Sequence, residues 1–113
     1  MLYYYITSRG DNPIKKFLDS LSDKQQAKTL RLLSLLEKYG PIREMPFIKK
    51  LAGTPLWEIR ILGKDNLRVL FARQKNTNIL ILHIFHKKKA KTEKPDLKVA
   101  LERYKKQLTN DIS

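Results

Sequence analysis

Hydrophobic positions in the first third of the chain repeat with the period of α-helices. Residues 14–21 place apolar side chains at i, i+3, i+4 and i+7, which predicts one buried helical face. Asp11 or Asn12 precedes this face as a cap. A second helix is predicted to begin at Ser22, a capping residue, and to end at Gly40. Its apolar stripe consists of Ala27, Leu30, Leu33 and Leu36.

The pattern in the rest of the chain predicts strands. Residues 2–6 are rich in aromatic side chains and suit a first strand. Residues 41–55 contain three prolines, which indicates a loop or a broken helix. Residues 56–62 and 67–73 alternate between apolar and polar side chains on either side of a short turn. Residues 79–85 are apolar on both faces, as expected of a central strand.

A last helix is predicted after Pro95. The resulting order is β-α-α-β-β-β-α within one domain that spans residues 1–113. We therefore expect an α+β fold with a single, mainly antiparallel sheet, two N-terminal helices and a C-terminal helix. The apolar stripe of the last helix consists of Leu97, Ala100, Leu101, Tyr104 and Leu108.

The two alternating strands predict a specific pair of arginines. Joining their apolar faces places Arg60 directly opposite Arg68 on the face that points away from the core, with Cβ atoms about 5 Å apart. The two guanidinium groups repel each other, and Glu58 is the carboxylate on that face that can offset them. A phosphate would also relieve the repulsion, because its oxygens match a guanidinium in a bidentate way. The alternative is a surface arginine pair with Glu58 as its counter-ion. The register behind this prediction pairs Ile61 with Leu67, Ile59 with Val69 and Trp57 with Phe71.

The charge balance points to a polyanionic partner. The 113 residues include 24 Lys and Arg against 11 Asp and Glu, a formal charge of +13. Nucleic acid or the ribosome explains this surplus most simply; an acidic protein partner and a merely solvated surface are the alternatives. No apolar run approaches the roughly 20 residues that span a bilayer, and the first residues show no secretion signal. With no cysteine in the chain, disulfides and thiolate sites are excluded, and we expect a cytoplasmic protein that binds no membrane.

The densest basic window follows the last predicted strand. A meander places this strand beside that of Arg68, so its lysines would lie at the rim of the same face. Basic groups beside an aromatic ring suit single-stranded nucleic acid, although Phe85 is also a candidate for the core. His83, in the middle of the strand among apolar residues, is expected to be a core histidine, whereas His86 at the strand end fits either role. The lysines expected at this rim are Lys87, Lys88 and Lys89, and the basic window also contains Lys91.

The stretch from residue 56 to residue 100 resembles the RelE/HigB superfamily of bacterial type II toxins, and most closely its phage-derived Gp49-like branch. The resemblance rests on the Leu-Trp-Glu-Ile-Arg strand, the Leu-Arg-Val-Leu-Phe strand and the Ile-Leu-His-Ile-Phe-His-Lys-Lys strand. The Lys-Pro entry into a final helix that contains Ala100 also fits, as does the Ile-Lys-Lys-Leu segment at 48–51. The resemblance covers nearly the whole chain.

The resemblance implies a toxin that enters the ribosomal A site and cleaves mRNA there without a metal or cofactor. A ribose 2′-hydroxyl would attack the adjacent phosphate, and basic groups would stabilise the charge that develops. The resemblance also implies a dedicated antitoxin, of the helix-turn-helix HigA-like kind. It assigns Arg60, Arg68, His86, Lys87 and Lys88 to the catalytic site, and Lys49, Lys50, Arg73, Phe85, Lys89 and Lys91 to RNA binding.

Two other functions stay open at this point. ParE-like members of the same superfamily share the fold but inhibit DNA gyrase, and a non-catalytic RNA- or ribosome-binding module would need the same basic face. The tyrosine that RelE uses in its C-terminal segment has no clear equivalent, because Tyr104 lies in the apolar stripe. Histidine is the side chain that exchanges protons near neutral pH, so His86 is the candidate for proton transfer.

Overall fold

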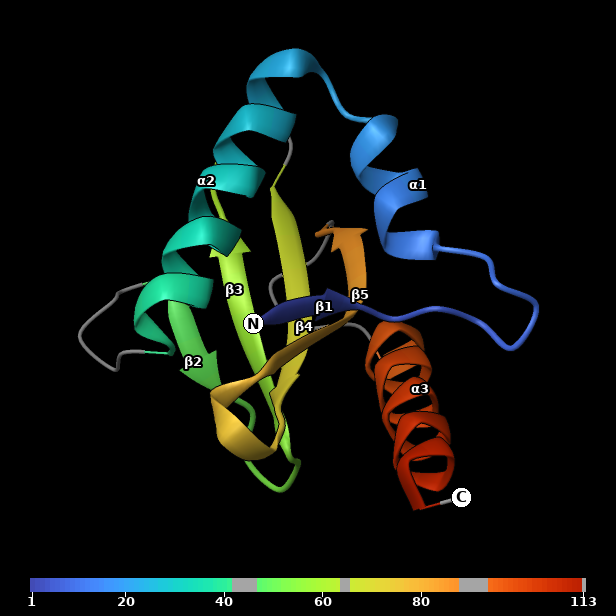
Figure 1. The fold of residues 1–113 in the computed structure, drawn as a ribbon. Helices are drawn as coiled ribbons and strands as arrows, with labels where there is room; N and C mark the ends of the chain where they lie inside the picture. The colour runs from blue at the N-terminus through green and yellow to red at the C-terminus, as the bar shows by residue number, and fades with distance from the viewer. Residues whose placement is uncertain (42–46, 64–65, 88–93, 113) are drawn as a thin grey trace.

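The computed structural model describes residues 1–41, 47–63, 66–87 and 94–112 (Figure 1). No helix in these ranges is long and apolar enough to cross a membrane. The elements follow the predicted order, with one additional short strand. They are β1 (Leu2–Tyr4), α1 (Pro13–Asp19), α2 (Asp23–Tyr39), β2 (Ile48–Lys50), β3 (Leu56–Ile61), β4 (Leu67–Arg73), the 3₁₀ turn η1 (Lys75–Thr77), β5 (Ile79–His86) and α3 (Lys94–Ile112).

The two N-terminal helices begin at the predicted caps. The Asn12 side chain accepts a hydrogen bond from the backbone N–H of Lys15, and the Ser22 hydroxyl accepts one from that of Gln25. α2 ends at Gly40, whose φ of 72° lies in the region that glycine adopts without strain. The predicted stripe of α2 is wrong at two positions. Ala27 and Leu30 are exposed, whereas Thr29 is buried beside Leu33 and Leu36.

All five strands belong to one sheet with the order β1-β5-β4-β3-β2. β1 pairs in parallel with β5, and the other pairs are antiparallel. The loop or broken helix expected over 41–55 is wrong for residues 48–50, which form β2. The strand is too short to show a period of two. It forms because Ile48 is buried opposite Ile59, which extends the apolar surface of β3 by one strand.

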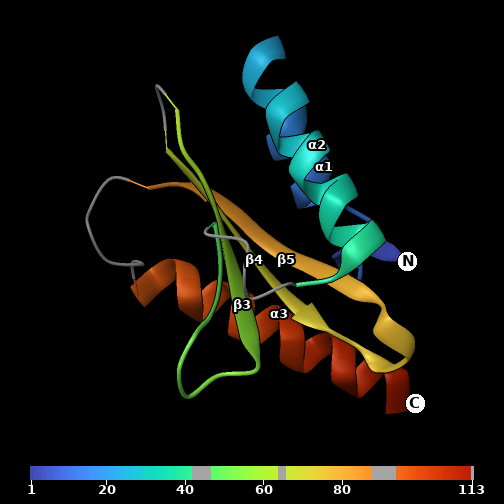
Figure 2. The ribbon, with the colours of Figure 1, turned by 90° about the vertical axis from the view of Figure 1, so that its left-hand side faces the viewer.

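Helices cover both faces of the sheet. α1 and α2 pack on one face over a core that includes Leu36, Ile59 and Phe71. α3 packs on the other face over a second core that includes Leu56, Leu70 and Ala100. Figure 2 shows the sheet between these two layers. The face of Arg60 and Arg68, expected to point away from any core, is therefore the face that α3 partly covers.

A β-bulge interrupts the pairing of β4 with β5. Leu70 is in register with His83, but the next residue, Phe71, is in register with Ile81, so Leu82 has no partner on β4. The extra residue reverses the alternation of the strand. Ile81 and Ile84 lie in the core under α1 and α2, whereas Leu82 and Phe85 lie in the core under α3. Strict alternation would have put residues 81 and 84 on opposite faces.

Candidate functional site

The predicted arginine pair is present. β3 and β4 adopt the register derived from the sequence, and Arg60 lies directly opposite Arg68. The hairpin has this register because Ile59, Val69 and Phe71 lie together in the core under α1 and α2, and a shift by one residue would turn one strand's set to the other face. The two arginines differ in exposure: Arg60 is exposed, whereas Arg68 is buried. The guanidinium of Arg60 is therefore accessible to solvent, whereas that of Arg68 is buried beside it.

Glu58 forms the centre of the charge cluster around this pair. Its carboxylate oxygen Oε1 lies 3.4 Å from Nε of Arg68 and 3.9 Å from Nζ of Lys49. The Glu58 side chain is only 1% exposed and that of Arg68 only 8%, whereas Lys49 is 58% exposed. Arg68 also donates a hydrogen bond from Nη1 to the Leu67 carbonyl, at 3.3 Å. Glu58 is therefore a counter-ion of Arg68, as in the alternative interpretation of the sequence, but its surface location is wrong for Arg68, because both side chains are buried.

Burial and neighbouring charges act in opposite directions on Arg68. Burial lowers the pKa of its guanidinium, and the positive charge of Arg60 lowers it further, whereas the Glu58 carboxylate raises it. Arginine keeps its proton under all these influences. Among the residues that the structure describes, the cluster therefore holds three cationic side chains around one buried carboxylate, which is a positive excess next to the exposed Arg60.

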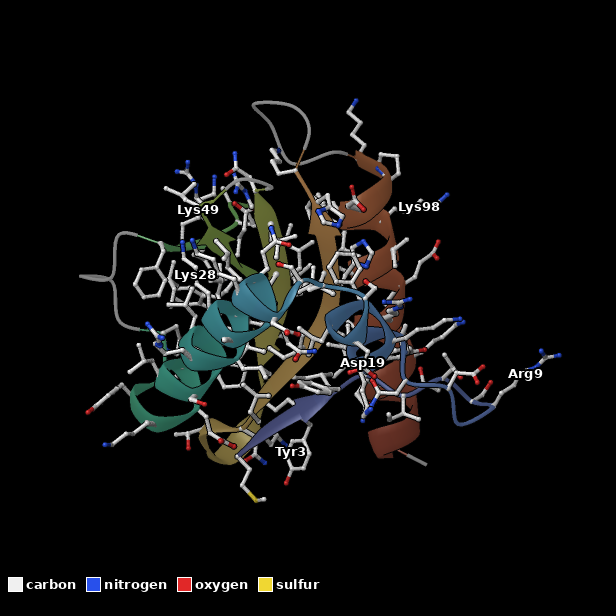
Figure 3. All side chains as sticks on the ribbon, turned by 90° about the horizontal axis from the view of Figure 1, so that it is seen from above. Tyr3, Arg9, Asp19, Lys28, Lys49 and Lys98 are labelled. Atoms are coloured by element: carbon white, nitrogen blue, oxygen red, sulfur yellow. The ribbon has the colours of Figure 1, made fainter. Side chains whose placement is uncertain are left out.

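The pairing of strands extends this cluster across the sheet in two rows. One row runs through Lys49, Glu58, Leu70 and His83, from β2 to β5. The next row runs through Arg60, Arg68 and Phe85. Residues two positions apart on a strand, such as Glu58 and Arg60, point to the same face. Both rows therefore lie on the face of the sheet that α3 partly covers. Figure 3 shows Lys49 on the β2 side of this region and Lys98 on α3.

His83 closes the cluster on the side of α3. Its Nε2 lies 2.8 Å from Oδ1 of Asp96, in the first turn of that helix. Its ring stacks on Phe85, with centroids 5.3 Å apart and planes inclined by 18°. The histidine and Asp96 side chains remain 17% and 22% exposed. Burial lowers the pKa of His83, Asp96 opposes this through its hydrogen bond and charge, and Arg103 lowers the pKa slightly further.

This histidine–carboxylate pair was not found from the sequence. His83 and Asp96 are thirteen positions apart, and the bulge that turns His83 toward α3 leaves no signal in the apolar run of β5. The sequence predicts a core histidine at this position, and the ring is indeed partly buried and hydrogen-bonded. The available clue was an acidic residue directly after Pro95, in the first turn of the predicted helix.

His86 lies on the opposite face of the sheet from Arg68. It is in register with Leu67, which belongs to the core under α1 and α2, and its ring lies 5.1 Å from that of Phe17 on α1. The structure therefore does not bring His86 into the cluster of Arg68 and Glu58. The bulge is the reason, because it exchanges the faces of the two histidines.

The remaining expected site residues are spread over the chain. Lys87 is half-buried at the end of β5, and its backbone N–H donates to the Asn66 carbonyl beside the β3–β4 turn, at 2.8 Å. Lys50 donates a hydrogen bond to the Thr54 carbonyl. Phe85 is buried and belongs to the core under α3. Lys88, Lys89 and Lys91 lie outside the described residues.

Arg73 lies away from the cluster. It ends β4 at the opposite end from Arg68 and lines a separate cleft with Tyr3, Tyr104 and Leu108. The two arginines are five positions apart along the strand, which rises about 3.3 Å for each residue. The structure therefore does not join Arg73 to the site that it forms around Arg68.

Two comparisons with known proteins relate the chain to others, and a third gives no match. The model of a family described as phage-derived protein Gp49-like (DUF891) matches residues 16–105. Among solved structures, the chain is similar to the E. coli toxin RelE, a double arginine-to-alanine mutant in the free state. The TM-score is 0.66 at 15% sequence identity, over 91% of this chain and 95% of that one. No curated protein matches the sequence.

Proposed function

Because the chain belongs to the phage-derived Gp49-like family and has the fold of RelE, we propose that it is the toxin of a type II toxin–antitoxin pair and cleaves mRNA on the ribosome. The observation that carries this proposal is the pair of Arg60 and Arg68, adjacent on the sheet beside the exposed Lys49. Three cations at one place, in a chain with a formal charge of +13, suit a phosphate of the RNA backbone.

The proposed reaction is attack by a ribose 2′-hydroxyl on the adjacent phosphate. Arg60 is exposed and makes the first contact with the phosphate oxygens. Arg68 lies next to it, where its guanidinium pairs with the Glu58 carboxylate and donates a hydrogen bond from Nη1 to the Leu67 carbonyl. A preorganised cation costs no rearrangement when negative charge builds up on the phosphate, so it favours the transition state over the ground state.

Lys49 and the basic segment after β5 extend the proposed contact with RNA. Lys49 reaches the cluster from the edge strand β2 and keeps most of its side chain exposed. Lys87 marks the start of the basic segment, next to the β3–β4 turn. In the proposal these lysines bind backbone phosphates on either side of the cleaved one. Lys50, Lys89 and Lys91 complete the proposed RNA-binding set, and Lys88 is proposed to act at the cleaved phosphate.

The proposed partners are the ribosome, its mRNA and a cognate antitoxin of the helix-turn-helix HigA-like kind. An antitoxin inhibits such an enzyme by covering the arginine pair, and the basic character of the cluster favours an acidic covering segment. We expect the antitoxin and RNA to compete for binding, because both would use Arg60 and Lys49.

Primer extension on a defined mRNA tests the proposed function. Purified protein is incubated with the message in the presence and absence of translating ribosomes, and the 3′ ends of the cDNA are mapped. Cuts that appear only with ribosomes, and that disappear when the cognate antitoxin is added, are the expected result. An intact message in both reactions would overturn the proposal, and inhibition of DNA gyrase supercoiling by the same sample would then assign the ParE-like activity.

A further inference from the structure

A histidine paired with a carboxylate lies beside the arginine cluster. His83 occupies the row next to that of Arg68, on the same face of the sheet, and its ring stacks on Phe85, the residue in register with Arg68. Diagonal neighbours of this kind have Cα atoms about 7–8 Å apart. One phosphodiester group can therefore contact a guanidinium on β4 and an imidazole on β5.

The position of His83 depends on the bulge in β5. Without the extra residue, His83 would lie on the face of Ile81, under α1 and α2. With it, the ring lies on the face of Arg68 and Glu58. Bulges occur often next to active sites, where they redirect a side chain. Arg103 on α3 stabilises the bulge in β5, because Nη1 of Arg103 donates a hydrogen bond to the carbonyl of Leu82, at 2.8 Å.

The bond to Asp96 fixes which nitrogen of the ring is basic. An ionised carboxylate only accepts hydrogen bonds, so Nε2 carries the proton that Asp96 accepts at 2.8 Å. The free electron pair is then on Nδ1. A carboxylate that orients an imidazole in this way also stabilises the imidazolium after it has taken up a proton.

We propose that His83, oriented by Asp96, is the general base of the cleavage reaction and removes the proton from the attacking 2′-hydroxyl. This inference rests on the proposed function. The bond from O2′ to phosphorus forms while the bond from phosphorus to O5′ breaks. The proton of the 2′-hydroxyl passes to Nδ1 of His83, and water supplies the proton that the O5′ leaving group takes up. The products are a 2′,3′-cyclic phosphate and a 5′-hydroxyl.

The charges around His83 favour this role. From α3 it is faced by Asp96 and Arg103, and from the neighbouring strands by Arg68 and Glu58. Tyr5 lies in the same core, where its ring contacts Arg103. Burial lowers the pKa of His83, so the ring is neutral at physiological pH and ready to accept a proton. Asp96 is a positioning residue, since it acts through the histidine.

The experiment is a pH–rate profile of single-turnover cleavage on programmed ribosomes. For the wild type we expect the rate to fall at low pH, as His83 becomes protonated. His83→Gln should cleave about 10²-fold more slowly or worse and should lose this acid limb, while it binds RNA as the wild type does. Asp96→Asn should move the limb to lower pH, because the carboxylate raises the pKa of His83. If Asp96 had a purely structural role, Asp96→Asn would not shift the acid limb of the pH–rate profile.

Lys98→Gln is the matched control, because Lys98 is exposed on the same helix and contacts none of these groups. Its profile should be that of the wild type. His83→Gln with an unchanged acid limb overturns the inference, and so does loss of that limb in His86→Gln alone. If the glutamine variant does not fold, the direction of the shift in Asp96→Asn decides. A wild type that cleaves nothing at any pH refutes the proposed function itself.

Discussion

The carboxylate of Glu58 lies 3.4 Å from Nε of Arg68 on the neighbouring strand, and both side chains are almost completely buried. A buried pair of this kind adds little net stability, because the cost of removing both charges from water offsets their attraction. Removal of one partner is different, since it leaves the other charge buried. Arg68 therefore has a structural role in addition to its proposed contact with the phosphate, and substitutions must separate the two.

The first prediction is that Arg68→Met and Glu58→Gln are coupled. Each single substitution should lower the free energy of unfolding, by about 3–5 kcal/mol for Arg68→Met, because Glu58 then stays buried with Lys49 at 3.9 Å. The double variant should lose less than the sum, by at least about 1 kcal/mol. Urea denaturation of the four proteins measures this coupling. Additive losses would show that the two side chains do not act as a pair.

The second prediction separates binding from stability at Arg60. This side chain is exposed and adjacent to Arg68, so Arg60→Gln should change the free energy of unfolding by less than about 0.5 kcal/mol. It should weaken RNA binding and reduce the salt dependence of the binding constant by about one phosphate contact. Fluorescence anisotropy at several salt concentrations measures both.

Arg31→Gln is the control for Arg60, because Arg31 is also exposed but lies on α2, across the sheet. Both variants remove one positive charge from the chain. Equal losses of RNA affinity in the two would mean that only the total charge matters, and that the cluster on β3 and β4 is not a site.

The arginine pair could be predicted from the sequence, whereas the position of the histidines could not. The register of β3 and β4 follows from the apolar residues at positions 57, 59 and 61 and at 67, 69 and 71, because a shift by one residue would remove one strand's set from the core under α1 and α2. In β5 both faces are buried, so Leu82 can be inserted without exposing an apolar side chain. No periodic signal marks the bulge, and the faces of His83 and His86 are exchanged relative to strict alternation.

The burial of Glu58 and Arg68 could not be predicted from the sequence either. Glu58 and Arg68 alternate with apolar residues as solvent-facing side chains do. They are buried because α3, far along the chain, packs on the same face over Leu56 and Leu70. Tertiary contacts of this kind leave the local pattern unchanged. The short strand β2, which brings Lys49 to Glu58, was missed for a related reason, since three residues cannot establish a period.

The third prediction concerns stability and pH. Burial lowers the pKa of His83 in the folded state, so the unfolded chain binds more protons once the pH falls to about 6.5, the usual range of histidine. The free energy of unfolding should then decrease as the pH falls through this range and level off below the lowered pKa. Denaturation at pH 8 and pH 5 measures the change. His83→Gln should show a smaller decrease, and an identical decrease would contradict the assignment.

The last prediction tests whether Arg103 holds the bulge that orients His83. Its guanidinium donates to the Leu82 carbonyl at 2.8 Å and lies 5.2 Å from the centre of the Tyr5 ring. Arg103→Met keeps much of the side-chain length but removes the donor, so the carbonyl at the bulge loses its partner at a cost of about 1–3 kcal/mol. We expect faster amide hydrogen exchange at His83 and Ile84 than in the wild type, and no change at Ile59 on β3. Because His83 is then less well oriented, cleavage should slow while RNA binding stays unchanged. Faster exchange with an unaltered cleavage rate would show that Arg103 stabilises the bulge but that the orientation of His83 does not depend on this contact.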